Sequence, residues 1–186
     1  MWPLSLQSEL LLLRPWKPAD ANTLFSLASN PKIGLNAGWK PHQSEEESLC
    51  IIENFLINPY DFAICFSSKP EVPIGAISLK TGNNNTCSQS KNEGELGFWI
   101  GEEYWGHTYT PKAAAMVIDF AFEVLHFDRI WCSCNTSNKQ SARVQEKLGF
   151  IYHHTETKIT REALQDTVDK RISVLNYTDW QNCNYI

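Results

Sequence analysis

The clearest hydrophobic pattern of the chain lies in residues 110–126, where nearly every side chain is apolar. After Pro111 the polar side chains recur at spacings of seven, four and three residues, which places them on one face of an α-helix: Lys112, Asp119, Glu123 and His126. Thr110 and Pro111 suit the N-cap and the first position of that helix. The pattern therefore predicts a helix entered at Thr110 whose other faces are covered.

A short apolar run precedes this helix. Residues 95–100 are aromatic and aliphatic and are bounded by Gly94 and Gly101, which predicts a strand followed by a glycine-containing turn over residues 101–109. A strand, such a loop and a helix N-terminus together direct unpaired backbone N–H groups and the positive end of the helix dipole at one place. The sequence therefore predicts a site for an anionic group before Thr110.

The remaining patterns predict six more strands, at residues 9–14, 61–67, 73–80, 129–135, 150–158 and 170–175. Helical spacing predicts helices at residues 20–29 and 138–148, and a third that Ser44 caps. Residues 31–43, which include Trp39, are expected to be a Gly/Pro-rich connection, and the Asn-rich residues 81–92 a flexible loop outside the core. This order predicts an α+β sheet of about seven strands with helices on its faces.

Size and charge limit what the domain does. A chain of 186 residues with 42% hydrophobic content is expected to form one domain, over residues 9–180, with short tails at 1–8 and 181–186. A net charge of -5 gives no general attraction for nucleic acid or anionic lipid. The N-terminus has no basic start, and its longest apolar run, residues 10–13, is too short to cross a bilayer, so a cytoplasmic location is expected.

The cysteines point to no metal site. There are six, too dilute for a disulfide scaffold: Cys50, Cys65, Cys87, Cys132, Cys134 and Cys183. They show no C-x-x-C or Cys/His ligand spacing, so no metal is expected.

Two separated motifs carry a family resemblance. GELGFWIGEEYWGHTYTPKA begins at Gly94, and NKQSARVQEKLGF begins at Asn138. Together they resemble the GNAT acyltransferases, in particular the RimJ/RimL-like ribosomal-protein N-acetyltransferases, over about residues 9–180. The resemblance implies a mixed, mostly antiparallel sheet with helices on both faces. It also implies a V-shaped splay between residues 95–100 and 129–135, where acetyl-coenzyme A binds.

The resemblance also assigns coenzyme-binding residues. The pyrophosphate would meet the backbone of Gly106, His107, Thr108, Tyr109 and Thr110, and the pantetheine arm would pair with Phe98, Trp99 and Ile100 and contact Asn138. His107 is alternatively a solvated loop tip. Thr108 stands where the family usually has glycine or alanine. It adopts positive φ only at a cost and adds a branched side chain, although its hydroxyl could donate to a phosphate; crowding is slightly favoured.

Acetyl transfer to an amine needs a base for the amine and a proton donor for the leaving thiolate. Glu95 is the candidate base, and a solvated strand-end carboxylate is the equally weighted alternative. The resemblance gives Ser141 the role of proton donor, with a structural hydrogen bond in the first helical turn as its alternative. The acceptor is expected to meet Glu95, Trp39 and the loops at residues 20–43, 81–92 and 152–169.

The leading functional prediction is an N-acetyltransferase that acts by direct attack on acetyl-coenzyme A in a ternary complex. Its expected acceptor is a primary amine, foremost a protein N-terminal α-amine. The alternatives are an acetyltransferase of a small-molecule amine, a coenzyme-binding regulatory domain with little turnover, suggested by Thr108, and a partner-binding domain that keeps the fold alone. The sequence leaves a homodimer open.

Overall fold

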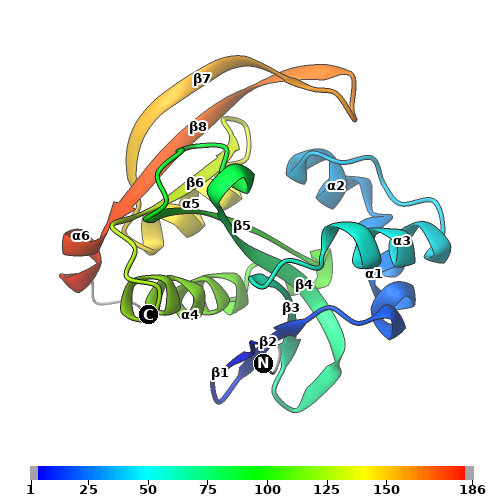
Figure 1. The fold of residues 1–186 in the computed structure, drawn as a ribbon. Coiled ribbons are helices and arrows are strands. Elements are labelled where there is room, and N and C mark those ends of the chain that lie inside the picture. The colour runs from blue at the N-terminus through cyan, green and yellow to red at the C-terminus, as the bar shows by residue number, and fades with distance from the viewer. Residues whose placement is uncertain (1–3, 183–186) are drawn as a thin grey trace. The chain divides into compact units, whose positions relative to one another are not determined.

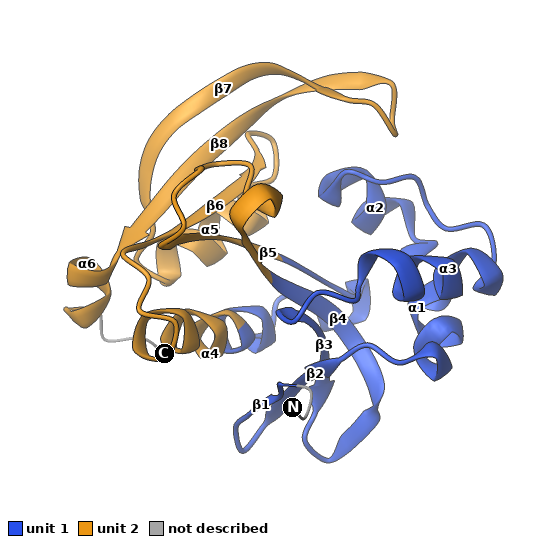
Figure 2. Cartoon of the chain, in the orientation of Figure 1, with its two compact units in different colours: residues 1–78, 98–113 blue, residues 79–97, 114–186 orange. Residues whose placement is uncertain are grey.

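The chain forms two compact units. The computed structural model describes residues 4–182, so Cys183 and most of the predicted C-terminal tail lie outside the described residues. Unit 1 comprises residues 1–78 and 98–113, and unit 2 comprises residues 79–97 and 114–186 (Figure 2). Strands β4 (Lys69–Thr81) and β5 (Glu93–Ile100) and helix α4 (Tyr109–Glu123) carry the chain from one unit into the other.

The strands follow the order β1-β2-β3-β4-β5-β6-β8-β7. The pairs β1–β2, β2–β3, β3–β4, β6–β8 and β7–β8 are antiparallel, and β5 pairs with β6 (Arg129–Asn135) in parallel. The α+β, mostly antiparallel fold predicted from the sequence is therefore confirmed, with eight strands in place of about seven. The extra strand, β1 (Leu6–Gln7), lies in the expected N-terminal tail and pairs with β2 (Leu11–Pro15).

In unit 1, three helices lie between strands β2 and β3 (Asp61–Phe66) along the chain, and residues of the first and the third share a core cluster with β3 and β4 (Figure 1). They are α1 (Ala21–Ala28), α2 (Pro31–Ala37) and α3 (Glu45–Phe55), and a 3-10 turn at Pro18–Asp20 leads into α1. Ser44 caps α3 as expected, because its hydroxyl accepts from the N–H of Glu47 at 3.1 Å. A buried bidentate ion pair joins Arg14 of β2 to Asp20, with N···O distances of 2.8 and 2.9 Å.

Helix α2 corrects the prediction of a connection at residues 31–43. The side chain of Asn30 caps it by accepting from the N–H of Lys32 at 2.9 Å, and Pro31 takes the first helical position, where its missing N–H costs nothing. Gly38 ends the helix in the left-handed conformation, with φ of 105°. The start of α4 is also corrected by one residue, since it begins at Tyr109 and Thr110 lies inside it.

Unit 2 contains β6, α5 (Lys139–Lys147), the hairpin of β7 (Ile151–Arg161) and β8 (Asp166–Asn176), and α6 (Tyr177–Gln181) (Figure 1). The strand predicted at residues 129–135 has the observed bounds, and Gly149 follows α5 with φ of 82°, as expected of a residue just past a helix end. The prediction of a loop over residues 152–169 is wrong, because the two last strands continue through most of it. No helix within residues 4–182 is long and apolar enough to span a membrane.

The parallel pairing of β5 with β6 is short. It runs from Glu93 opposite Arg129 to Leu96 opposite Cys132, whereas β5 continues to Ile100 and β6 to Asn135. The register thus covers four residue pairs at the start of both strands, as the predicted splay requires.

Candidate active site

The carboxylate of Glu95 is buried in unit 2, with only 3% of the residue exposed. One oxygen, Oε2, accepts hydrogen bonds from the backbone N–H and the hydroxyl of Thr86, both at 2.8 Å. The other, Oε1, accepts from the hydroxyl of Ser133 at 3.2 Å and lies 4.0 Å from Nζ of Lys80. Glu95 is therefore not a solvated strand-end carboxylate, while its role as a base stays a prediction.

The segment that presents Thr86 is anchored rather than loose. Asn85 is only 1% exposed, and its amide donates to the carbonyl of Glu93 at 3.3 Å. Its Oδ1 accepts from the N–H groups of Cys87 and Ser88 at 2.9 and 3.1 Å, which closes a turn of the kind that Asn side chains favour. The expectation that residues 81–92 lie outside the core is wrong at Asn85, because this side chain is buried and fixes the turn.

Asn138 begins α5 as predicted. Its Oδ1 accepts from the N–H of Ser141 at 3.0 Å, which satisfies one of the free N–H groups of the first turn. Ser141 is half-buried beside Cys134 of β6. Burial raises the pKa of the Cys134 thiol, which the neighbouring Gln145 and Ser141 side chains partly oppose, so Cys134 stays a neutral thiol at pH 7. The proton-donor role of Ser141 remains a prediction.

In unit 1, the end of β5 is held closely. A Cβ on Gly75 of β4 would lie 2.4 Å from the carbonyl oxygen of Trp99, so only glycine allows this approach. The N–H of Gly101 donates to the carbonyl of Ile74 at 2.9 Å, and the indole N–H of Trp105 donates to the carbonyl of Ile100 at 3.0 Å. The predicted coenzyme-pairing residues, Phe98, Trp99 and Ile100, thus belong to a fixed strand end.

The predicted phosphate loop leads directly into α4. Gly106 has φ of 80°, and no atom lies within 4 Å of the place where a Cβ would stand. Glycine at an open left-handed position lets another group approach the backbone, which fits a phosphate next to a helix N-terminus.

Thr108 does not carry the strain anticipated from the sequence. It is exposed and is not among the described non-glycine residues with positive φ. Its carbonyl accepts from the N–H of Lys112 at 3.1 Å, which gives Thr108 the N-cap position of α4. His107 is exposed, as its alternative interpretation expects, and stacks on Tyr109 with 5.0 Å between ring centroids.

Trp39, the predicted acceptor residue, contacts the predicted coenzyme residue Trp99. Their rings meet edge to face at 5.6 Å between centroids. Helix α2, just before Trp39, is tied to the turn after β5. The amide of Asn30 donates to Oε2 of Glu102 at 2.8 Å, and Nζ of Lys32 forms an ion pair with Oε1 of the same residue. Unit 1 thus joins the Trp39 segment to the segment that enters the phosphate loop.

Sequence reasoning missed the residues that hold Glu95: Lys80, Thr86 and Ser133. Ser133 follows from the pairing of β5 with β6. Glu95 stands opposite Trp131, and Ser133, two residues further along β6, lies on the same face of the sheet as Trp131. Thr86 left no comparable signal, because its position depends on the turn that Asn85 closes.

Comparison with known proteins agrees with this geometry. A family model described as "Acetyltransferase (GNAT) domain" matches residues 11–151, about three quarters of the chain. The chain belongs to the GNAT acetyltransferases. The family fold is thereby shown, as is its general activity, the transfer of an acetyl group to an amine.

Related proteins and solved structures extend this result. The GNAT chain is 24% identical over 156 residues to the uncharacterized N-acetyltransferase YoaA of Bacillus subtilis (strain 168), over 81% of this chain and 84% of YoaA. A GNAT-family acetyltransferase structure from Bacillus anthracis has a TM-score of 0.81 at 18% identity and covers 94% of this chain and 99% of its own. The ribosomal-protein-S5-alanine acetyltransferase from Vibrio fischeri has a TM-score of 0.70 at 23% identity, over 95% and 98%. At these identities the two structures show the fold alone.

Proposed function

We propose that this GNAT protein transfers the acetyl group of acetyl-coenzyme A to a primary amine, foremost the N-terminal α-amine of a protein, in the manner of the RimJ/RimL-like enzymes. The main support is the β5–β6 register, which ends at Leu96 and Cys132 although both strands continue. Strand backbone beyond the paired region offers N–H and C=O groups that an extended ligand can use as an added strand would.

The coenzyme supplies an acetyl thioester, and the protein has to bind and orient it. We assign the diphosphate to the backbone N–H groups from Gly106 to Thr110, supported by the open left-handed glycine and the helix N-terminus. We assign the polarisation of the thioester carbonyl to the backbone N–H near Ile100, whose own carbonyl already accepts from Trp105. Asn138 would contact the pantetheine region while it caps α5.

The chemistry requires removal of one proton and delivery of another. Glu95 would take the amine proton directly or through a water, and its three fixed donors keep the carboxylate in one orientation. Ser141 would donate a proton to the leaving thiolate. An α-amine has an ordinary pKa of about 8, so it needs less help from a base than a lysine of pKa about 10.4.

A protein N-terminus is favoured as acceptor for two reasons. The fold matches that of a ribosomal-protein alanine acetyltransferase, although at 23% identity. The net charge of -5 also favours a positively charged amine partner. We place Trp39 in the acceptor site, since it touches Trp99, and we place the reaction in the cytoplasm, where nascent protein N-termini are available.

The regulatory alternative rested on Thr108, through a costly positive φ or through crowding of the phosphates by its branched side chain. Thr108 is not among the described residues with positive φ, so crowding is the reason that is left for this alternative. A small-molecule amine stays as the competing acceptor.

Thermal unfolding with acetyl-coenzyme A tests the proposal first. Millimolar coenzyme should raise the melting temperature, as any ligand of the native state does, and an unchanged value would contradict the assignment. Release of free thiol with a panel of amines, including ribosomal-protein N-terminal peptides, then identifies the acceptor. Turnover on small amines alone would favour the competing acceptor class.

A matched pair of glycine variants tests the phosphate loop. Gly106 and Gly82 both have positive φ, 80° and 56°, and open space at the Cβ position. Alanine should therefore destabilise either site by a similar amount, on the order of 1 kcal/mol. Only Gly106→Ala should also weaken coenzyme binding, and equal binding by both variants would refute the loop assignment.

A further inference from the structure

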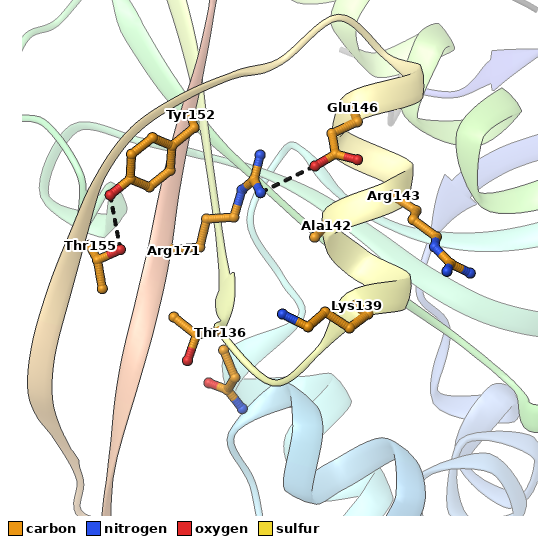
Figure 3. A pocket seen from close by; sticks show the side chains of 9 residues that line it. Thr136, Lys139, Ala142, Arg143, Glu146, Tyr152, Thr155 and Arg171 are labelled. Atoms are coloured by element: carbon orange, nitrogen blue, oxygen red, sulfur yellow. Dashed lines mark hydrogen bonds and ion pairs between the residues drawn. The ribbon is translucent and has the colours of Figure 1, made fainter.

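A pocket of about 450 Å³ in unit 2 is lined by none of the residues to which a step of the proposed reaction is assigned. It lies between α5 and the β7–β8 hairpin and is lined by Asn135, Thr136, Lys139, Ala142, Arg143, Glu146, Tyr152, Thr155 and Arg171 (Figure 3). The lining residues of α5 are spaced three and four apart and form one face of that helix. Asn138 and Ser141, the predicted site residues at the start of α5, are not among the residues that line the pocket.

A β-bulge shapes the polar wall of this pocket. Tyr152 stands opposite Ser173, but His154 stands opposite Ile172, so His153 is an extra residue in β7. In β8, Arg171 and Ser173 are two residues apart and therefore share a face. Tyr152 stands opposite Ser173 and Thr155 stands opposite Arg171, so the bulge places Tyr152 and Thr155 on one face of β7 although they are three residues apart. The two hydroxyls lie 3.1 Å apart, and regular alternation would have put these side chains on opposite faces.

The pocket also concentrates positive charge in an acidic protein. Lys139, Arg143 and Arg171 line it together with a single carboxylate, Glu146. Figure 3 shows Lys139 and Arg171 directed into the space between α5 and the hairpin, whereas the guanidinium of Arg143 points to the other side of the helix.

Arg171 and Lys139, the two cations directed into the pocket, differ in how many contacts they already make with other side chains. The guanidinium of Arg171 lies 5.5 Å above the ring of Tyr152, and its Nη1 is 3.1 Å from Oε1 of Glu146. The Glu146 side chain is 54% exposed, so water weakens this ion pair and an incoming anion can replace the carboxylate. Lys139 has no ion pair or hydrogen bond from its ammonium group to the described residues.

We propose that this pocket binds the phosphate or carboxylate group of a small metabolite. Arg171 offers a planar donor to two anionic oxygens, Lys139 adds a second charge, and the Tyr152 and Thr155 hydroxyls supply neutral donors. The volume lies within the range of small-molecule sites. This proposal goes beyond acetyl transfer and does not depend on the identity of the proposed acceptor.

Calorimetric titration with inorganic phosphate and with succinate tests the proposal on the whole chain at low ionic strength. We expect saturable binding of at least one probe at millimolar concentration, and the tighter probe identifies the chemical class of the ligand. Lys139→Gln should weaken binding by about fivefold, the effect of a partly exposed ion pair. Tyr152→Phe, which removes only a hydroxyl from a half-exposed side chain, should weaken it by a smaller factor.

Lys147→Gln is the matched control, since Lys147 is an exposed cation of the same helix outside the pocket. Its binding should equal that of the unmodified protein. The proposal is overturned by the absence of saturable binding up to about 20 mM, a level at which any specific site would be detected. It is also overturned by equal weakening in the Lys147 variant, or by loss of anion binding when coenzyme A saturates the protein, which would assign the anion to the coenzyme site.

Discussion

Replacement of Glu95 by glutamine separates the catalytic role of this residue from its structural role. The carboxylate accepts three hydrogen bonds, two from Thr86 and one from Ser133, and it lies 4.0 Å from the ammonium of Lys80. A glutamine of the same shape can keep its oxygen toward Thr86. Its amide can donate to the Ser133 hydroxyl, which accepts as well as donates. The fold should therefore survive.

The structural cost can be estimated from these contacts. Lys80 is 41% exposed, so loss of its ion pair costs at most about 1 kcal/mol. The hydrogen bonds with Thr86 and Ser133 become weaker when the charged carboxylate is replaced by a neutral amide, and this adds a similar amount. Glu95→Gln should therefore lower the free energy of unfolding by about 1–2 kcal/mol. Glu95→Ala instead leaves the donors without their acceptor and should cost about 2–4 kcal/mol. A lost general base lowers kcat by about 10²–10⁴.

Urea unfolding and steady-state kinetics over a range of pH measure the two effects. We expect Glu95→Gln to retain coenzyme affinity, to lose kcat by the larger factor, and to flatten the acidic limb of the pH profile. Ser133→Ala is the control, since it removes one hydrogen bond and no base, and its kcat should change only a few-fold. Full activity of Glu95→Gln with a small loss of stability would refute the base and leave Glu95 as an anchor for residues 81–92.

Three further predictions concern single residues. Thr108→Gly should weaken coenzyme binding, because Thr108 occupies an N-cap position with ordinary φ and its hydroxyl is available to a phosphate; tighter binding by titration would instead support crowding. Ser141→Ala should lower kcat by about 10²–10⁴ without changing coenzyme affinity, and an unchanged kcat would leave water as the proton donor. His42 is buried with Nδ1 2.8 Å from the hydroxyl of Ser48, and burial lowers its pKa although the charge of Glu47 opposes this. The unfolded chain therefore takes up the proton first, so this contribution to stability is complete above about pH 6.5 and is lost as the pH falls below it. Urea unfolding of His42→Asn should show a shallower loss between about pH 7 and pH 5, and an identical slope would contradict the assignment.

The sequence was sufficient where local signals agree with the packed structure. Alternation and flanking polar residues located β6, and the Asn138 cap with Gly149 located α5. It failed at α2, where Pro31 and Gly34 indicated a connection. Gly34 is in this helix because a Cβ there would lie 2.9 Å from the indole nitrogen of Trp39, a contact that only the folded chain reveals.

In the candidate site, too, some residues were predictable from the sequence and others were not. Glu95 and Asn138 belong to recognisable motifs, and each lies in the element that the motif indicated. The donors that Thr86 provides to Glu95 did not follow from the sequence, because Thr86 reaches the carboxylate through a turn that the Asn85 side chain closes between the 3-10 turn Gly82–Asn84 and β5. An Asn-rich stretch indicates a mobile loop unless the burial of one side chain is known. Loop-borne contacts of this kind depend on tertiary packing, which local patterns do not encode.

The extra residue in β7 has an evolutionary consequence. Tyr152 and Thr155 share a face because one residue between them, His153, is bulged out of the regular alternation. Deletion of His153 would remove the bulge and leave Tyr152 and Thr155 two residues apart, and regular alternation would then keep both side chains on the same face of the hairpin. A related gene could thus lose this codon and still encode the polar wall of the pocket, while the residues of the acetyl-transfer site stayed unchanged.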